Sequence, residues 1–390
     1  MPKRSEELRI IVFGGMVSLP LPGILFQALH YMNGLRSLGF DPWYVEDSSR
    51  WVYDPDQGQY VESSPAQIRH LEPFLRKYDL LHRFCFRAGP GTFTYAQSPV
   101  DIDELYRSTD LFLNITGAQD IRNEHLQIPI RVYVESDPFS AQVKFNSNDE
   151  YTQQQLNAHT HFFSFGENIG QSDCLIPATG HPWLPTRQPV DLSIWPATER
   201  TIDAYRTITT WTNKGKDIDW EGTRWYWTKD REFKKYLDLP RRVDPDLVLA
   251  TNVDPTTATL LEDAGWVVDP SRFSGRESEQ YIHYIARSRG EFTVARDQYW
   301  RPRTGWFSDR SACYLAAGRP VVTQETGFSR FVPTGEGLFG FSSLDEAAAA
   351  IETIESDYDR HRNAAREIAA EYFDARKVLT RLFESVFSTS

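Results

Sequence analysis

The chain has 390 residues, of which 40% are hydrophobic and 25% are charged, a composition typical of a soluble globular protein with room for two domains. Its net charge of −12 argues against broad binding to nucleic acid or to an anionic membrane surface. Three cysteines stand far apart with no C-x-x-C pair, which argues against a disulfide framework and against structural zinc. The chain has neither an apolar run of the roughly 18 residues that a membrane helix needs nor a signal-peptide pattern, so we expect a cytoplasmic protein.

Strand and helix signals alternate along the first half of the chain. Short apolar runs predict strands, and helical spacing of apolar residues predicts the helices between them. The strands are expected at 8–15, 41–47, 109–117, 128–138 and 160–167, and the helices at 23–40 and 65–81. Repeated strand–helix–strand units predict a parallel sheet with helices covering its faces.

A proline-rich stretch separates this half from a second alternating series. Five prolines between positions 177 and 196 prevent a single regular element from forming, so we interpret residues 181–200 as a linker. Strand and helix signals then alternate again from about residue 205, and 358–387 predicts a helix. We therefore expect an α/β protein of two doubly wound Rossmann-like domains, 1–180 and 201–355, followed by a helical segment, 356–390.

The stretch RTGWFSDRSACYLAAGRPVV, residues 303–322, predicts a helix that Ser308 caps and Gly318 ends. An arginine in the first turn, Arg310, opposes the helix dipole unless an anion lies at the helix N-terminus. Free backbone N–H groups would bind a phosphate there, and Arg310 or Ser311 would close the site. The alternative is an ordinary capped helix with an arginine on its surface.

Further charged residues bear on the same phosphate hypothesis. Asp309 suits the first helical turn but would repel a phosphate, so we expect its carboxylate to orient Arg301 or Arg303 instead. Lys214 and Lys216 follow the first strand of the second domain and are candidates for phosphate contact. Solvated surface charge is the alternative interpretation of both lysines.

Other candidate residues follow the predicted strands of the first half, on the side where open α/β sheets bind ligands. Gly14 and Gly15 would let the backbone approach a ligand closely, or would simply form a tight turn. Glu135 and Asp137 end a strand before Pro138 and could include a general base, the alternative being a helix cap or a turn. Asp120 is likewise exposed after a strand.

Two further patterns carry weaker functional signals. GEGLFG, residues 335–340, matches the dinucleotide-binding fingerprint G-x-G-x-x-G, but no helix opens on these glycines, so we expect a turn before a short strand. His159 and His161 alternate along one predicted strand without an evident carboxylate partner, and we expect no metal site there.

The layout as a whole resembles the GT-B glycosyltransferases. The motif that carries the resemblance is GWFSDRSACYLAAGRPVV and its continuation to residue 351, in which a helix, a small-Gly-x-Pro-Val-Val segment and a glycine-rich turn precede a short strand and an acidic helix. The phrase SDRSACYLAAG is similar to the spore-maturation-type (CgeB-like) bacterial members, in which an arginine opens this helix. RVYVESDPFSAQ, residues 131–142, also looks like a segment of that group.

The resemblance implies two domains facing each other across a cleft, with the C-terminal helix crossing back to the first domain. It implies transfer of a sugar from a nucleoside diphosphate sugar to a small-molecule or glycan hydroxyl, with no obligatory metal and no other cofactor. We expect no nucleic-acid partner, because the net charge is −12. By position, Ser308, Arg310 and Ser311 would hold the diphosphate together with Lys214, and the acceptor would enter near Gly14, Gly15 and Asp137.

The sequence departs from the family pattern at two positions. Retaining members carry two glutamates eight positions apart over this helix, and Gly305 and Cys313 stand there instead. Two rival functions therefore stay open: a nucleotide-sugar epimerase on the same scaffold, and a binding protein that keeps the nucleotide site without turnover.

Overall fold

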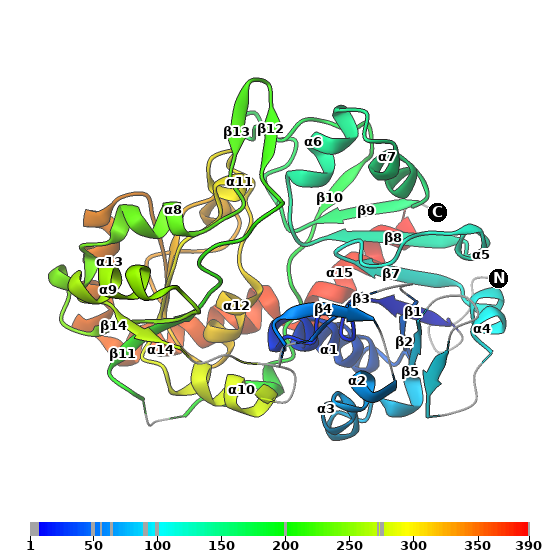
Figure 1. The fold of residues 1–390 in the computed structure, drawn as a ribbon, viewed down its shortest axis with the longest axis horizontal. Coiled ribbons are helices and arrows are strands. Elements are labelled where there is room, and N and C mark those ends of the chain that lie inside the picture. The colour runs from blue at the N-terminus through cyan, green and yellow to red at the C-terminus, as the bar shows by residue number, and fades with distance from the viewer. Residues whose placement is uncertain are drawn as a thin grey trace.

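The computed structural model describes residues 8–47, 51–54, 57–62, 65–88, 93–97, 101–198, 201–270, 273 and 277–388. Figure 1 shows two α/β halves side by side, each built around its own sheet with helices on the faces. Among these residues, no helix combines the length and the apolar character that a membrane crossing requires.

The sheet of the first half has the order β10-β9-β8-β7-β1-β2-β5-β6 and is parallel except for β6, which is antiparallel to β5. Its central strand β1 is wholly buried, which explains why the predicted strands are unbroken apolar runs. A separate hairpin, β3–β4, follows β2. The strands are β1 Ile10–Phe13, β2 Trp43–Glu46, β3 Trp51–Asp54, β4 Gln59–Glu62, β5 Phe84–Arg87, β6 Thr94–Ala96, β7 Leu111–Ile115, β8 Ile130–Glu135, β9 His161–Ser164 and β10 Trp183–Pro185.

Helices connect these strands as expected for a doubly wound fold. The first one, α1, opens on Pro22, whose fixed φ and missing N–H suit the first turn. The helices of this half are α1 Pro22–Ser37, α2 Pro65–Arg69, α3 Glu72–Lys77, α4 Ile102–Ser108, α5 Asn123–Leu126, α6 Ser140–Asn146 and α7 Glu150–Asn157. The proline-rich segment 181–200 also contributes to this half, because β10 within it pairs with β9.

The second half contains two parallel three-stranded sheets, β11-β14-β15 and β16-β17-β18, which a bridge between Tyr205 and Gly290 joins. A Cβ atom on Gly290 would lie 2.5 Å from the Tyr205 ring, so this close approach requires glycine. The strands are β11 Ala204–Ile208, β14 Asp246–Ala250, β15 Val267–Asp269, β16 Glu291–Thr293, β17 Val321–Gln324 and β18 Leu338–Phe341. The helices are α8 Asp230–Phe233, α9 Pro255–Asp263, α10 Ser278–Arg287, α11 Asp297–Trp300, α12 Asp309–Ala316 and α13 Leu344–Ser356.

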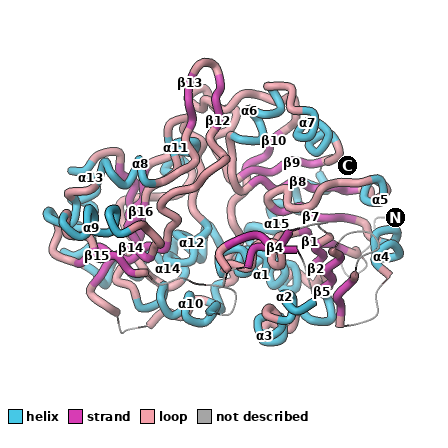
Figure 2. The backbone as a smooth tube through the Cα atoms, in the orientation of Figure 1, coloured by secondary structure: helices cyan, strands magenta, loops and turns pink. Residues whose placement is uncertain are grey.

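A two-stranded hairpin, β12 Ile218–Trp220 and β13 Thr223–Trp225, reaches from the second half toward the first. Figure 2 shows it rising at the boundary between the halves, near α6. The ring of Phe139, which precedes α6, lies 4.7 Å from that of Trp225 and 6.1 Å from that of Trp220. Phe139 has a φ of +101°, a conformation that costs energy for a non-glycine residue, and its buried aromatic contacts offset that cost.

The C-terminal segment returns to the first half. The helix expected over 358–387 is divided into α14 Tyr358–Ile368, a π-helical turn Ala369–Phe373 and α15 Ala375–Ser388. At the break, Asp374 pairs with Val190, and α15 then packs on α1 where a Cβ on Gly34 would lie 2.6 Å from Leu379 Cδ1. The doubly wound α/β fold with a returning C-terminal helix is thus confirmed, although that helix is not continuous.

Candidate functional site

The helix predicted to bind a phosphate is α12, and its N-terminus is open. Ser308 is the N-cap residue, as predicted, but its side chain makes no capping hydrogen bond. Ser311 is buried, and its Oγ has no hydrogen-bond partner among the described residues. The first backbone N–H groups of α12 are therefore free of side-chain caps.

Arg310 is bound to the sheet rather than free at the helix end. Its Nε donates to Glu291 Oε1 at 2.6 Å, and its Nη2 donates to Thr293 Oγ1 at 2.9 Å. Glu291 begins β16 and is fully buried, so the pair ties α12 to that strand. The arginine predicted to close a phosphate site is thus first of all a structural partner of Glu291.

A lysine that the sequence does not single out lies beside this pair. Lys229, which precedes α8, is only 7% exposed, and no hydrogen bond or ion pair joins its Nζ to the described residues. Burial, together with the positive charges of Arg310 and Arg296, holds the pKa of Lys229 well below its usual range. A buried cation without a partner is costly, and an anionic ligand would remove that cost.

Arg296 connects this positive group to the first half. Its Nη1 donates to the Tyr299 hydroxyl at 2.9 Å and lies 3.7 Å from Asp137 Oδ1, and the Tyr299 hydroxyl donates in turn to Asp137. The guanidinium stacks on the Trp227 ring at 3.9 Å, and its buried Nε has no partner among the described residues. Asp137 thus faces the positive groups of the second half, with 44% of its side chain exposed.

Asp309 faces α1 of the first half. Its Oδ2 accepts a long hydrogen bond of 3.5 Å from Gln27 Nε2. Burial and the nearby charge of Asp137 raise the pKa of Asp309 to about 7. It therefore orients neither Arg301 nor Arg303, contrary to expectation, and in its neutral form it would not repel a phosphate.

The two positions where the family pattern has glutamates have local explanations. Gly305 has a φ of +79°, and a Cβ there would lie 2.6 Å from the backbone nitrogen of Asn168, so no larger residue fits. Cys313 is buried, with its Sγ 3.9 Å from His30 Nε2 of α1. Burial lowers the pKa of His30 to about 4, and its Nδ1 accepts a hydrogen bond from the Asp191 N–H.

Among the remaining predicted cations, Arg301 and Arg303 are paired with carboxylates and Lys214 is exposed. Arg301 Nη2 donates to Asp297 Oδ2 at 2.7 Å, and its guanidinium stacks on Trp225. Arg303 pairs with Asp173 at 3.0 Å. Lys214 is exposed in the loop before β12.

The predicted carboxylates of the first half are dispersed. Glu135 and Asp137 both line a polar cavity of about 270 Å³. Asp120 instead accepts a hydrogen bond from Tyr151. Asp137 is therefore the predicted carboxylate that meets both this cavity and the cations of the second half.

The contacts of Gly14 and His159 are with neighbouring side chains and backbone of the first half. A Cβ on Gly14 would lie 3.0 Å from the Tyr44 hydroxyl, whereas Gly15 has open space around it. His159 is buried and bonded to Asn114 and to the carbonyl of Gln155. Residues 335–337 form a bend that leads into β18, as expected.

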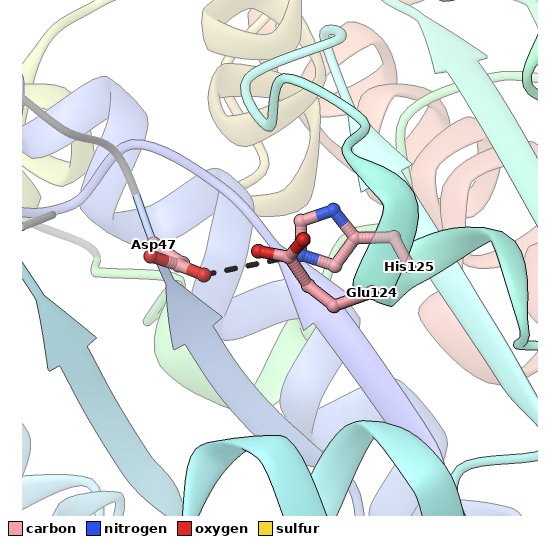
Figure 3. Close-up of side chains that lie close together, drawn as sticks. All are labelled: Asp47, Glu124 and His125. Carbon is pink, nitrogen blue, oxygen red and sulfur yellow. Dashed lines mark ion pairs between the residues drawn. The ribbon is translucent and has the colours of Figure 1, made fainter. Parts of the chain in front are cut away.

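A group with potential metal ligands lies elsewhere, at the end of β2, where Asp47 faces His125 beside Glu124 (Figure 3). Arg87 and Arg122 both pair with the buried Asp47 carboxylate. Although burial alone would raise it, the nearby His125, hydrogen bonds from Arg87 and the charge of Arg122 hold the pKa of Asp47 well below its usual range. Because two guanidinium groups already neutralise the carboxylate, we interpret the cluster as structural.

Comparison with known proteins places the fold. No protein-family model and no curated protein sequence matches the chain. Solved structures do: an α-glucosyltransferase in complex with UDP-glucose and DNA containing an abasic site is 11% identical, with a TM-score of 0.55 over 97% of this chain and 99% of that chain. Anabaena HepE in complex with UDP is 11% identical, with a TM-score of 0.56 over 98% and 100%. AviGT4, a glycosyltransferase involved in avilamycin A biosynthesis, is 13% identical, with a TM-score of 0.54 over 97% of both chains. The fold is therefore that of the GT-B glycosyltransferases.

Arg310→Ala is expected to lower stability, because it leaves the buried Glu291 carboxylate without its cation. Breaking one side of a buried pair costs about 3–5 kcal/mol, which corresponds here to a fall of several degrees in melting temperature. Thermal unfolding measures this fall, and Arg303→Ala, which breaks an exposed pair, serves as the control. Equal melting temperatures for the two variants would contradict the structural role of Arg310.

Proposed function

We propose that the protein transfers a sugar from a nucleoside diphosphate sugar to an acceptor hydroxyl. The observation that carries the proposal is the buried, unpartnered Lys229 next to Arg296, close to the uncapped start of α12. A diphosphate would satisfy the free N–H groups and both cations at once. The solved structures of this fold that contain UDP or UDP-glucose support a uridine nucleotide as the first donor to test.

The cations would also promote the reaction. Negative charge develops on the diphosphate as the bond to the sugar breaks, and fixed positive groups in a partly buried site stabilise that charge. In this proposal Lys229, Arg296 and the α12 N-terminus supply the stabilisation, and the reaction needs no metal ion. Ser308, Ser311 and Lys214 remain proposed contacts of the donor.

Asp137 is the residue that we propose as general base. Its carboxylate faces both the cations of the second half and the cavity of the first half, so an acceptor hydroxyl in that cavity would lie between base and donor. The hydrogen bond from Tyr299 and the charge of Arg296 would keep the carboxylate oriented.

Lys229→Met is expected to weaken UDP binding about 10- to 100-fold, the cost of losing a charge-assisted contact. Isothermal titration calorimetry with UDP measures the effect. Lys234→Met is the matched control, because Lys234 lies one turn further along and pairs with Asp230 at the surface. Unchanged UDP affinity in Lys229→Met would show that Lys229 does not bind the diphosphate and would contradict the proposal. Lys214→Met tests in the same way whether Lys214, in the exposed loop, contacts UDP.

UDP binding is expected to take up a proton, and to weaken as pH rises through the pKa that Lys229 has in the complex. Burial holds the pKa of Lys229 low in the free protein, and a bound diphosphate would raise it, so the complex favours the protonated lysine. Titrations in buffers of different ionisation enthalpy measure the proton uptake. Lys229→Arg, which keeps the charge but does not titrate, is expected to bind UDP without it. Zero uptake by the wild-type protein would contradict this assignment.

Asp137→Asn is expected to slow sugar transfer, followed as UDP release from UDP-glucose, by about 10²- to 10⁴-fold while UDP affinity changes little. Asp149→Asn is the control, because asparagine replaces aspartate well at the N-cap of α7. A rate in Asp137→Asn equal to that of the control would exclude Asp137 as base. A product that keeps its nucleotide but has a changed sugar stereocentre would instead indicate an epimerase.

A further inference from the structure

The proposed base and the proposed donor site belong to different halves of the protein. Asp137 follows β8 of the first half, whereas Lys229, Arg296 and the N-terminus of α12 belong to the second. Neither sheet alone therefore sets the distance between base and donor. A general base acts only within hydrogen-bond reach of the proton that it removes, so direct contacts between the halves beside Asp137 decide whether it is in place.

Trp306 of the second half makes such a contact. Its indole Nε1 donates a hydrogen bond of 2.8 Å to the backbone carbonyl of Ser136, the residue before Asp137. Because β8 ends at Glu135, this carbonyl lies just beyond the strand. Trp306 is 9% exposed and Ser136 is 5% exposed, so water competes little for the bond.

Tyr299 contacts the side chain of Asp137 from the same direction. Its hydroxyl donates to Asp137 Oδ1, and its ring centroid lies 4.4 Å from that of Trp306, with 34° between the ring planes. Tyr299 is fully buried, and the Trp227 ring packs edge-on against it at 5.7 Å. The two neighbouring rings of Tyr299 and Trp306 thus contact both the carboxylate of Asp137 and the backbone that precedes it.

The backbone of Trp306 is itself fixed within the second half. Its N–H donates to Thr304 Oγ1 at 3.1 Å, and its carbonyl accepts from Thr326 Oγ1 at 2.5 Å. Thr304 Oγ1 donates in turn to the Tyr299 carbonyl at 3.0 Å, which links the two aromatic residues along the chain. Both threonines are buried. The Trp306 ring is therefore carried by a backbone that has little freedom to move.

The first half meets this segment at a second point. Asn168, in the loop after β9, is fully buried; its N–H donates to the Thr304 carbonyl at 3.0 Å, and its Nδ2 donates to the Arg303 carbonyl at 2.8 Å. A Cβ atom at position 305 would lie 2.6 Å from the Asn168 nitrogen, so Gly305 permits this close approach. The aromatic contact beside Asp137 therefore belongs to a continuous junction between the halves.

The contact between Trp306 and Ser136 depends on the indole N–H. Phenylalanine would fill much of the same space but has no hydrogen-bond donor, so the Ser136 carbonyl would lose its partner. Trp306→Phe therefore removes one hydrogen bond between the halves and leaves an aromatic ring in the junction.

We propose that Trp306 is a positioning residue for the sugar transfer: from the second half, its indole N–H holds the backbone before Asp137 and so keeps the base aligned with the donor. The proposal rests on the proposed function, with Asp137 as base, and adds to it a residue through which one half controls the chemistry of the other. Trp306 acts through Asp137 in this role, not on the donor.

A double-mutant cycle tests the proposal, with kcat measured as UDP release at saturating UDP-glucose. Trp306→Phe is expected to lower kcat about 10- to 100-fold, because a displaced base loses its alignment. In the Asp137→Asn background the same substitution is expected to change kcat less than about twofold, because no base is left to align. UDP affinity, measured by calorimetry, is expected to stay within about threefold of wild type, since the donor contacts are intact.

Trp266→Phe is the matched control. Trp266 is buried, and its Nε1 donates a hydrogen bond of 2.9 Å to the Leu237 carbonyl inside the second half, so this variant loses the same kind of bond away from Asp137. It is expected to keep its kcat. An unchanged kcat in Trp306→Phe, or equal losses in the two backgrounds, would overturn the positioning role alone. Absence of UDP release by the wild-type protein, or full activity of Asp137→Asn, would count against the proposed function instead.

Thermal unfolding shows whether Trp306→Phe is folded. If it is not, Thr326→Val replaces it, because this variant removes the hydrogen bond to the Trp306 carbonyl and leaves the indole in the chain. A smaller loss of kcat is then expected, again only where Asp137 is present. A loss that is as large in the Asp137→Asn background would contradict the assignment.

Discussion

The pair between Arg310 and Glu291 is the interaction on which the position of the α12 N-terminus depends. Two charges removed from water are stable together only when their geometry is good, and here the guanidinium also bonds to Thr293 on the same strand. The pair holds the first turn of α12 against β16. It thereby fixes where the free N–H groups of that turn lie relative to Lys229 and Arg296, which approach from other segments.

A chain with a net charge of −12 can still present a concentrated positive site, because the charges that matter are local. Near the start of α12 the fold gathers Lys229, Arg296 and Arg310 and leaves Glu291 as the carboxylate that balances Arg310. Across from them, burial favours the neutral form of Asp309. The site thus combines two arginines of fixed charge with a lysine and a carboxyl whose charges depend on their surroundings, an arrangement suited to anionic ligands.

Local patterns in the sequence predict the elements of this fold well, because a buried parallel strand is an apolar run and a helix end carries its own signals. The start of α12 after Ser308 is an example. Local patterns do not predict which partners a side chain finds. Lys229 and Lys234 lie in one basic stretch and no local signal distinguishes them, yet Lys229 is buried and Lys234 pairs with Asp230 at the surface. Likewise Arg296 and Arg301 belong to one run of arginines. Only the fold shows that Arg296 lies beside Asp137 whereas Arg301 pairs with Asp297.

The β12–β13 hairpin is inserted in the second half, yet it closes a cavity whose floor belongs to the first half. Its tryptophans rest on Phe139, which also begins the helix that forms one wall. The lining of this cavity therefore comes from two segments far apart in the chain. A longer or shorter hairpin would change the size of the cavity without altering any residue of the first half.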